Sequence, residues 1–282
     1  MRKLAVLLLI PLLLLSGCVT IPGVQTGAKG GDISVSLSVD STEIPAGSPL
    51  GLSISIENKA LMPMKNISIN ITAPEGWKLS SPQPSVSDIQ REGSWEGVWI
   101  YTAPSEVMVD TPYKFYARVT FSMNTTRGAS ITLVNYDYYK RTGEKSKVST
   151  QTPDTGGPIG IEFGQLGQMS YMYTGQGATI PLKVIISNRG SGKAYVGDEP
   201  NSTNLNKVEF YSTKEFINCS VPDDNIVYLM KEGSVATVMC NINISAGNVT
   251  DVKIIPVSVT VSYNYVYDLV SPTITVKSIT YS

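Results

Sequence analysis

Two stretches of this 282-residue chain, 47–59 and 177–189, share one pattern at an offset of 130 residues. In each, a glycine is followed by apolar residues at every second position, and an asparagine and a basic residue end the run. A period of two puts alternate side chains on opposite faces, so each run predicts a strand with one buried face. Such a strand can recur by chance, but the matched spacing favours two related domains. The apolar positions are Leu50, Leu52, Ile54 and Ile56, then Ile180, Leu182, Val184 and Ile186.

Most of the remaining chain also reads as strands. Apolar residues alternate with Ser, Asp or Asn over 33–39 and 67–71. β-Branched or aromatic residues predict further strands over 98–102, 113–123, 129–139, 169–174, 207–212, 226–230, 234–244, 252–267 and 273–277. Outside the N-terminal segment, no stretch carries an apolar stripe of helical period. Short strands separated by Gly, Pro, Asn and Asp predict an all-β chain of two antiparallel β-sandwiches in tandem.

The domain boundaries follow from the repeat. The first sandwich is expected over 32–140 and the second over 159–282. Between them, residues 141–158 contain charge, Gly and Pro without a core pattern, and they predict an interdomain linker. The alternative is a long hairpin loop within one larger sandwich.

The N-terminal segment predicts export. Arg2 and Lys3 precede an apolar run over 4–15, which is shorter than the about 20 residues that a membrane-spanning helix needs. Small residues follow this run. Residues 1–17 therefore predict a secretory signal peptide.

The end of this signal predicts a lipid anchor. Leu15-Ser16-Gly17-Cys18 resembles the lipobox of prokaryotic lipoproteins, which implies cleavage before Cys18 and attachment of lipid to its sulfur. The alternative is an ordinary signal peptide that is cut elsewhere. Residues 18–31 are rich in Gly and small polar residues, and they predict a flexible tether.

The cysteine and histidine content limits which catalytic and metal sites the chain can form. Cys219 and Cys240 remain as a pair in an exported chain, which favours a disulfide over two buried thiols. The sequence contains no histidine, so Ser-His-Asp and Cys-His catalysis and imidazole zinc sites are excluded. The net charge of −1 gives no concentrated positive surface for nucleic acid. No cofactor and no metal are expected.

A family resemblance rests on the first half. LGLSISIENKA, KNISINITAPEGW, GVWIYTAP and TPYKFYARVTF follow in the order of the immunoglobulin-like NEW3 and CARDB-type domains of archaeal and bacterial surface proteins. The usual Asn-x-Gly turn reads Asn58-Lys59-Ala60 here, whereas Asn188-Arg189-Gly190 in the second half matches it. The resemblance covers most of 32–140 and, more weakly, 159–280. It implies immunoglobulin-like sandwiches and an extracellular setting but no activity.

Asn-x-Ser/Thr sequons are frequent in the chain, and they mark candidate glycosylation sites on the solvated faces of strands. Chance is the alternative, because strand-rich sequences use Ser and Thr heavily. Together with the lipobox, the sequons suggest an archaeal envelope. The seven candidates are Asn66, Asn70, Asn124, Asn201, Asn218, Asn243 and Asn248.

Aromatic residues offer one candidate ligand site. Trp95, Trp99 and Tyr101 share one strand parity and could stack on a sugar ring. The structural alternative puts Trp99 and Tyr101 in the core, which leaves Trp95 as the candidate ligand residue. The tyrosines at 136, 138 and 139 and at 263, 265 and 267 could serve association or stabilise the sheets.

Acidic residues give weaker candidates. Asp198-Glu199 and Asp223-Asp224-Asn225 lie in predicted loops and could offer oxygen ligands to Ca²⁺, but their spacing matches no calcium loop and solvated turns account for them. Glu92 and Glu96 could be imagined as glycosidase carboxylates, yet no apolar pocket is evident for either.

Together these features predict a membrane-anchored cell-envelope lipoprotein on the extracytoplasmic face. Its expected role is structural, adhesive or protein-interacting, without catalysis. Its expected partners are the membrane, through the lipid, and envelope proteins or glycans. The alternative is a surface lipoprotein that binds a glycan or another solute.

Overall fold

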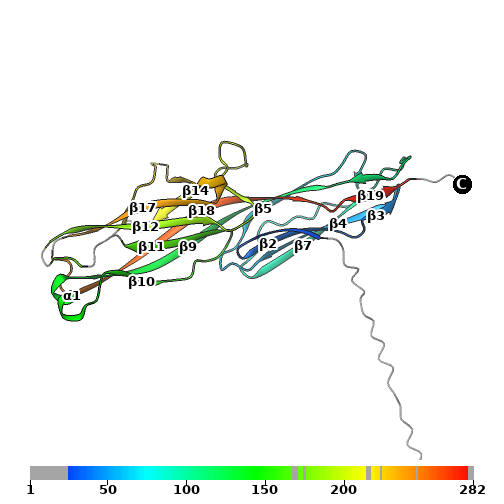
Figure 1. The fold of residues 1–282 in the computed structure, drawn as a ribbon. Helices are drawn as coiled ribbons and strands as arrows, with labels where there is room; N and C mark the ends of the chain where they lie inside the picture. Colours follow the sequence, from blue (N-terminus) through cyan, green and yellow to red (C-terminus); the bar gives the residue numbers. More distant parts are fainter. Residues whose placement is uncertain are drawn as a thin grey trace, which may run out of the picture.

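The computed structural model describes residues 25–166, 171–173, 176–213, 217–222, 224–245 and 247–278. Cys18 and the signal peptide lie outside these ranges. The chain is all-β, and its strands form four sheets whose pairs are antiparallel except for one. Figure 1 shows an elongated molecule with α1 (Tyr136–Thr142) at one end and β3 (Glu43–Pro45) and β19 (Ile274–Lys277) at the other.

Two sheets repeat the same strand arrangement. The first has the order β1-β2-β4-β7-β6, and the second has the order β11-β12-β17-β15. The two repeated sequence patterns form β4 and β12, which occupy equivalent interior positions. The bounds are β1 Gln25–Gly30, β2 Ile33–Val39, β4 Pro49–Asn58, β6 Lys78–Leu79, β7 Gly93–Thr102, β11 Ile159–Leu166, β12 Ala178–Asn188, β15 Ile217–Cys219 and β17 Val235–Ile244.

The repeat extends to single hydrogen bonds. The Asn58 side chain accepts from the Ala60 N–H at 3.0 Å and donates to the Met62 carbonyl at 3.0 Å. Asn188 makes the same two bonds, with the Gly190 N–H and the Gly192 carbonyl, both at 3.0 Å. Each asparagine therefore closes the turn after its strand in the same way.

A third, seven-stranded sheet runs through both halves and is called the central sheet below. Its path is β10-β9-β18-β14-β16, with β5 also paired to β9 and β13 to β18. β9 and β18 each have 19 residues and pair along their whole length. The bounds are β5 Lys65–Thr72, β9 Tyr116–Val134, β10 Lys147–Gln151, β13 Lys193–Tyr195, β14 Lys207–Ser212, β16 Ile226–Tyr228 and β18 Val252–Val270.

The buried faces of these sheets form one hydrophobic core with a sandwich-like arrangement. Phe115, directly before β9, lies 5.0 Å from the Tyr101 ring of β7. In the other half, the Gln151 amide donates to the Phe163 carbonyl of β11 at 3.0 Å. The smallest sheet, β3-β19-β8 (β8, Thr111–Tyr113), joins the end of the chain to the first half, with β19 parallel to β3.

Several sequence expectations are confirmed. The alternating runs form β2, β4, β5 and β12 with the expected inward faces, and the expected strands over 207–212 and 273–277 match β14 and β19 within one residue. Trp99 and Tyr101 are core residues, as the structural alternative expected.

Two expected strands are wrong. Of the strand expected over 169–174, residues 171–173 are described, and they make only an isolated bridge at Met172. The strand expected over 129–139 ends at Val134, and α1 follows. Asn135 caps this helix by accepting from the Tyr138 N–H, and Gly143 ends it with a φ of 75°. Within residues 141–158, Lys147–Gln151 form β10 against β9. The short α2 (Met230–Gly233) has non-helical dihedrals at Lys231 and Glu232 and is a tight turn.

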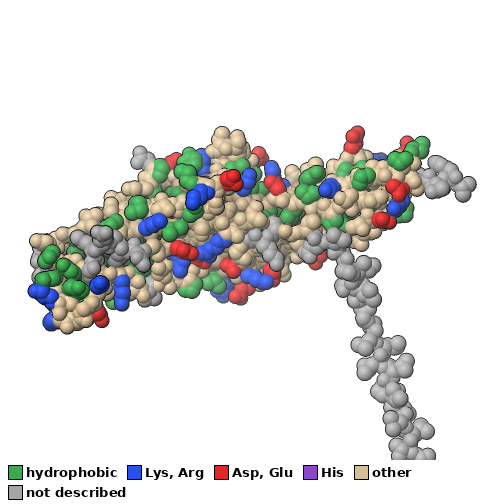
Figure 2. Space-filling view, viewed as in Figure 1, with side chains coloured by type: hydrophobic (Ala, Val, Ile, Leu, Met, Phe, Trp, Pro, Cys, Tyr) green, Lys and Arg blue, Asp and Glu red, His purple; other side chains and the backbone are tan. Residues whose placement is uncertain are grey.

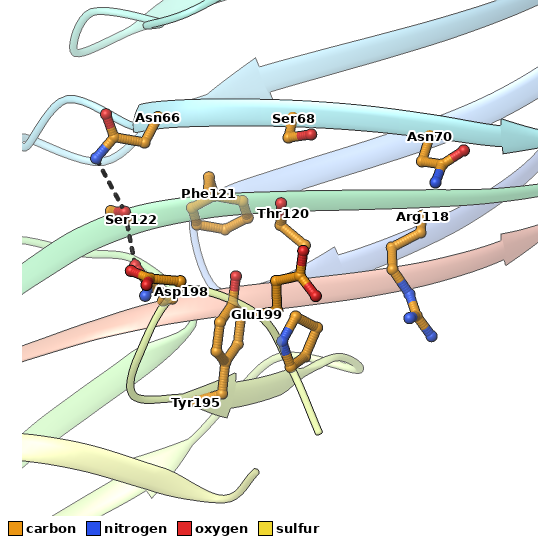
Figure 3. Close-up of a pocket in the computed structure, with 12 residues that line it drawn as sticks. Asn66, Ser68, Asn70, Arg118, Thr120, Phe121, Ser122, Tyr195, Asp198 and Glu199 are labelled. Atoms are coloured by element: carbon orange, nitrogen blue, oxygen red, sulfur yellow. Dashed lines mark hydrogen bonds between the residues drawn. The ribbon is translucent and has the colours of Figure 1, made fainter. Parts of the chain in front are cut away.

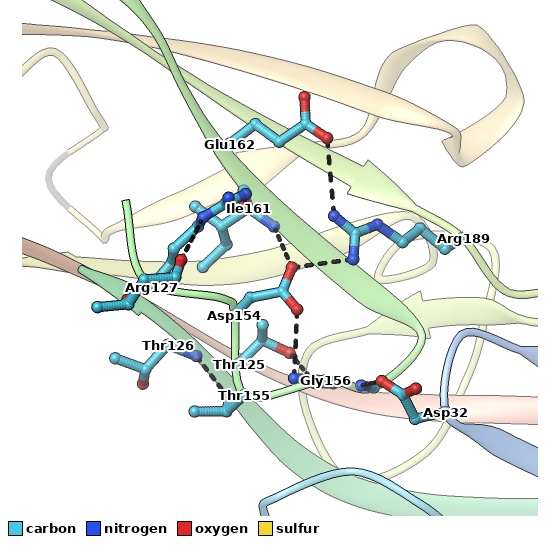
Figure 4. Close-up of polar contacts among 12 residues, drawn as sticks. Asp32, Thr125, Thr126, Arg127, Asp154, Thr155, Gly156, Ile161, Glu162 and Arg189 are labelled. Atoms are coloured by element: carbon cyan, nitrogen blue, oxygen red, sulfur yellow. Dashed lines mark hydrogen bonds and ion pairs between the residues drawn. The ribbon is translucent and has the colours of Figure 1, made fainter. Parts of the chain in front are cut away.

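The stretch after β10 is held in place by side chains from both halves, as Figure 4 shows. Asp154 accepts from Arg189 at 2.9 Å and is largely buried. Arg127 donates to the Thr152 carbonyl at 2.9 Å, and the Thr126 N–H donates to Thr155 at 2.9 Å. These contacts define the 152–158 clasp, which ties the start of β11 to β9.

Candidate functional site

A hollow lined mainly by polar side chains lies on the outer face of the central sheet. It has a volume of about 650 Å³ and is called the polar groove. β5 forms one side, β9 and β18 form the floor, and the loop after β13 forms the other side (Figure 3). The lining residues are Asn66, Ser68, Asn70, Arg118, Thr120, Phe121, Ser122, Tyr195, Asp198, Glu199, Pro200 and Asn264.

A chain of hydrogen bonds crosses the floor of the polar groove. Asn66 donates to the Ser122 hydroxyl at 3.3 Å, and Ser122 donates to Asn264 at 2.6 Å. Asn264 in turn donates to the Gly197 carbonyl at 2.6 Å. The floor is therefore fixed to both sides. Asn66 itself has a φ of 52°, a backbone conformation that asparagine adopts more readily than most residues.

The loop beside the polar groove is also internally ordered. Asn201 accepts from the Thr203 N–H at 2.9 Å and from the Thr203 hydroxyl at 2.6 Å. Asn204 donates to the Glu199 carbonyl at 2.7 Å. This turn orders the backbone that carries Asp198 and Glu199 at the groove.

Charge is arranged asymmetrically around the polar groove. Arg118 pairs with Asp268 at 2.7 Å on the exposed sheet face, and this bond raises the pKa of the guanidinium. Asp198 and Glu199 lie at the facing loop, as Figure 3 shows. Burial raises the pKa of the Tyr195 phenol, so that its hydroxyl stays neutral. The groove therefore offers amides, hydroxyls and carboxylates at fixed positions, which suits a ligand with many hydroxyl groups.

The polar groove gathers four of the seven sequons. Asn66 and Asn70 line it, and Asn124 lines an adjoining hollow of about 140 Å³ that shares Ser122 and Asn264. Asn201 stands next to the groove residue Pro200. All seven sequon asparagines are exposed, and the other three are Asn218, Asn243 and Asn248.

The expected disulfide is confirmed. Cys219 of β15 and Cys240 of β17 lie directly opposite each other and are joined, with an S–S distance of 2.05 Å. Cys240 is completely buried.

Trp95 does not lie in the polar groove. It lies on β7 and is half-buried, and its ring centroid lies 6.2 Å from that of Trp99. A Cβ atom on Gly97 would come within 2.3 Å of the Trp95 ring, so the ring packs closely against this glycine.

The acidic candidates do not assemble. Within the described ranges, no three or more Cys, Asp or Glu side chains are grouped as metal ligands would be. Asp224 accepts from the Ile226 N–H at 3.0 Å, which is the role of a turn residue, and Asp223 lies outside the described residues. Of the two described helices, neither has the length and hydropathy needed to cross a membrane.

Sequence reasoning did not find the polar groove, because its residues come from four separate elements. A signal was nevertheless present on the outward positions of the strands. Ser68 and Asn70 alternate with apolar residues in β5, and Arg118, Thr120 and Ser122 do so in β9. Only the pairing of these strands brings the polar positions together.

The chain matches no protein-family model and no curated protein.

Proposed function

We propose that this protein is a cell-envelope lipoprotein, held on the extracytoplasmic face of the membrane by lipid on Cys18. Its role is structural, adhesive or protein-interacting, without catalysis. In this proposal each half is an immunoglobulin-like sandwich of the NEW3 or CARDB type, and residues 18–31 tether the first sandwich. The protein carries glycans on the exposed sequons. It contacts envelope proteins or glycans.

The observation that carries this proposal is the unbroken pairing of β9 with β18. Nineteen consecutive residue pairs cross from one half to the other, so the halves cannot separate without breaking a continuous strand ladder. The Asp154–Arg189 ion pair, at 2.9 Å, fixes the segment between the halves to the second half. Such a body resists bending between its halves, and a stiff extended body is suited to hold a surface away from its anchor.

Membrane attachment is tested by the substitution Cys18→Ser. The variant is expected to leave the membrane fraction or to retain an uncut signal, because serine lacks the sulfur to which the lipid would be attached. Thr20→Ser, two residues further on, is the matched control and should behave as the unaltered chain does. The readouts are fractionation and the intact mass of the mature protein. A mature protein with an unmodified Cys18, or one that lacks it, would contradict the proposal.

A second function, binding of a glycan, is favoured by the polar groove. Its amide and hydroxyl groups are fixed by the bonds of Asn66, Ser122 and Asn264 before any ligand arrives, which lowers the entropic cost of binding. An alternative occupant is a glycan of the chain itself, attached at Asn66 or Asn70.

The substitution Glu199→Ala tests whether the polar groove binds a glycan or binds nothing. If the groove binds free oligosaccharides, the variant should weaken binding about tenfold, because it removes a charged hydrogen-bonding group. Glu96→Ala, on the exposed face of β7, is the control and should have no effect. Ser68→Ala abolishes the Asn66 sequon, so a gain of oligosaccharide binding in this variant would indicate that an attached glycan fills the groove.

A further inference from the structure

A cluster of half-buried and exposed tyrosines with exposed cations lies at the end of the molecule where Figure 1 places α1. It is called the aromatic-basic tip and consists of Tyr136, Tyr138, Tyr139, Lys140 and Arg141 of α1 with Tyr171 and Tyr173. Five of the 15 tyrosines of the chain therefore gather at one end. Figure 2 shows hydrophobic and basic side chains side by side there.

The rings of the aromatic-basic tip pack on one another. The Tyr139 and Tyr171 rings are stacked, with centroids 4.8 Å apart. Tyr136 lies 4.9 Å from Tyr171 and 5.2 Å from Tyr173. The Lys140 ammonium is 4.5 Å from the Tyr136 ring centroid. The cluster is thus a continuous aromatic surface with a cation at its side.

The backbone holds this surface in place. The Met172 N–H donates to the Val134 carbonyl at 2.9 Å, and the Tyr136 N–H donates to the Met172 carbonyl at 2.7 Å. Met172 is buried, so its neighbours Tyr171 and Tyr173 are directed to the other side of the segment. The rings are therefore presented by fixed backbone.

The tip tyrosines differ in burial from the second group of tyrosines in the sequence, at 263, 265 and 267. Tyr263, Tyr265 and Tyr267 are core residues, each at most 4% exposed. None of the tip tyrosines is buried, and Tyr173 is 54% exposed. Core packing accounts for Tyr263, Tyr265 and Tyr267, but it does not account for the tyrosines of the tip.

Positive charge is concentrated around the aromatic-basic tip. Residues 136–147 and 251–253 contain Lys140, Arg141, Lys145, Lys147 and Lys253 against Asp137, Glu144 and Asp251. These five cations and three acids give a local charge of +2, in a chain whose net charge is −1. Asp251 is engaged with Arg141 at 2.8 Å, and Lys140, Lys145 and Lys147 are exposed.

We propose that the aromatic-basic tip binds an acidic polysaccharide. Sugar rings stack on exposed aromatic faces through their C–H groups, and the carboxylates of uronic acid units would pair with the lysines beside the rings. Each tyrosine also carries a hydroxyl that can bond to a sugar hydroxyl. The combination of ring, hydroxyl and cation fits a charged sugar chain better than a lipid tail, because every ring of the tip ends in a polar group.

Binding is tested with the full chain, purified in detergent, and a soluble polyuronate. We expect binding that weakens as salt is raised, because exposed charges are screened. Neutral dextran should bind at least several-fold more weakly. Lys140→Glu and Tyr173→Ser should each weaken polyuronate binding about fivefold to tenfold.

The chain provides a matched control for each variant. Lys207 lies 4.6 Å over the ring of Tyr228, which is 51% exposed, so this pair has the same chemistry at a different place. Lys207→Glu and Tyr228→Ser should leave binding unchanged. Circular dichroism should show that all four variants remain folded.

Three results would overturn the proposal. The first is equal loss of binding in the tip and control variants, which would indicate a general charge effect. The second is equal binding of dextran and polyuronate, or no binding of either. The third is a tip that binds anionic lipid vesicles but not polyuronate, which would assign it to a membrane surface. The assay is in solution, so its outcome is independent of whether Cys18 carries lipid.

Discussion

Buried tyrosines illustrate how single residues set the stability of this protein. Tyr263, Tyr265 and Tyr267 lie on the inward face of β18, with Tyr265 and Tyr267 ring centroids 5.1 Å apart. The Tyr265 hydroxyl donates to Asn188 at 2.8 Å, and that of Tyr263 lies 3.0 Å from the Thr125 hydroxyl. The Tyr267 hydroxyl is buried without a hydrogen-bond partner among the described residues. The three positions therefore respond differently to loss of the hydroxyl.

Tyr267→Phe is expected to leave the free energy of unfolding unchanged or to raise it by about 1 kcal/mol, because a buried unsatisfied hydroxyl is costly. Tyr265→Phe should lower it by about 1 kcal/mol, since the hydrogen bond from its hydroxyl to Asn188 is lost. Urea denaturation at neutral pH measures both. Equal destabilisation by the two variants would show that Tyr267 also has a partner.

The same tyrosines predict loss of stability in alkali. Burial raises the pKa of all three phenols well above the ordinary value of 10. Below that pH the folded and unfolded chains are both protonated at these sites, so stability is unaffected. Above it the unfolded chain loses protons that the folded chain keeps, and stability falls by up to about 1.4 kcal/mol per pH unit for each tyrosine.

Urea midpoints measured from pH 8 to 11 check this expectation. Tyr267→Phe should reduce the alkaline slope, whereas Tyr228→Phe, at an exposed ring, should not. A slope that is the same in all three proteins would contradict the assignment.

At the scale of single residues, the sequence predicted structural roles better than binding roles. The matched asparagines of the repeat were recognised, and Asn58 and Asn188 make identical bonds. Cys219 and Cys240 were expected to form a disulfide and do. The grouping of the polar groove residues was missed. Asn70 was expected only as a sequon and Glu199 only as a weak calcium candidate, because with Arg118 they share no local motif and meet only in the folded chain.

At the scale of elements, most strands follow from alternation, but their partners do not. Period two fixes which side of β9 is buried, yet nothing in the sequence states that β9 pairs with β18 over 19 residues. α1 was missed because its seven residues carry no apolar stripe. Asn135 and Gly143, at its two ends, were the available signals, since Asn is favoured at N-caps and Gly at C-terminal ends.

The disulfide between β15 and β17 is expected to hold a short edge strand. It spans 21 residues, and closing a loop of this size contributes about 3 kcal/mol in the chain-entropy account. A reductant should therefore lower the urea midpoint of the unaltered protein. The double variant Cys219→Ala with Cys240→Ala is the control and should be insensitive to reductant. Free thiols without a change in midpoint would contradict this role.

The 152–158 clasp predicts resistance to proteases. Asp154 is 11% exposed and pairs with Arg189 at 2.9 Å, so Asp154→Asn should lower stability by about 1.5–3 kcal/mol, the range for hydrogen bonds to charged groups. Cleavage within 152–158 should become faster in this variant. Glu162→Gln is the control, since this exposed pair at 3.7 Å should contribute less than about 1 kcal/mol. Rapid cleavage of the unaltered chain at the clasp would contradict the observed contacts.

At the scale of the whole molecule, the two halves that the sequence repeat relates are joined by sheets to which both contribute strands. Residues 252–263 of β18 pair with the end of β9, and residues 264–270 continue along its beginning. The chain then ends in β19, between β3 and β8 of the first half. The repeat suggested two units separable at 141–158, whereas the strand order makes each half depend on a strand from the other.

Cooperative unfolding is the consequence that can be measured. We expect one calorimetric transition whose calorimetric and van't Hoff enthalpies agree, because neither half keeps its central sheet when the other unfolds. A fragment of residues 1–145 lacks both β18 and β19, so it should stay unfolded alone and fold on addition of 146–282. The disulfide lies within the second fragment and should be kept oxidised in both experiments. Two resolved transitions, or a folded first fragment, would show that β9 and β18 are stable without each other and that the halves are independent domains.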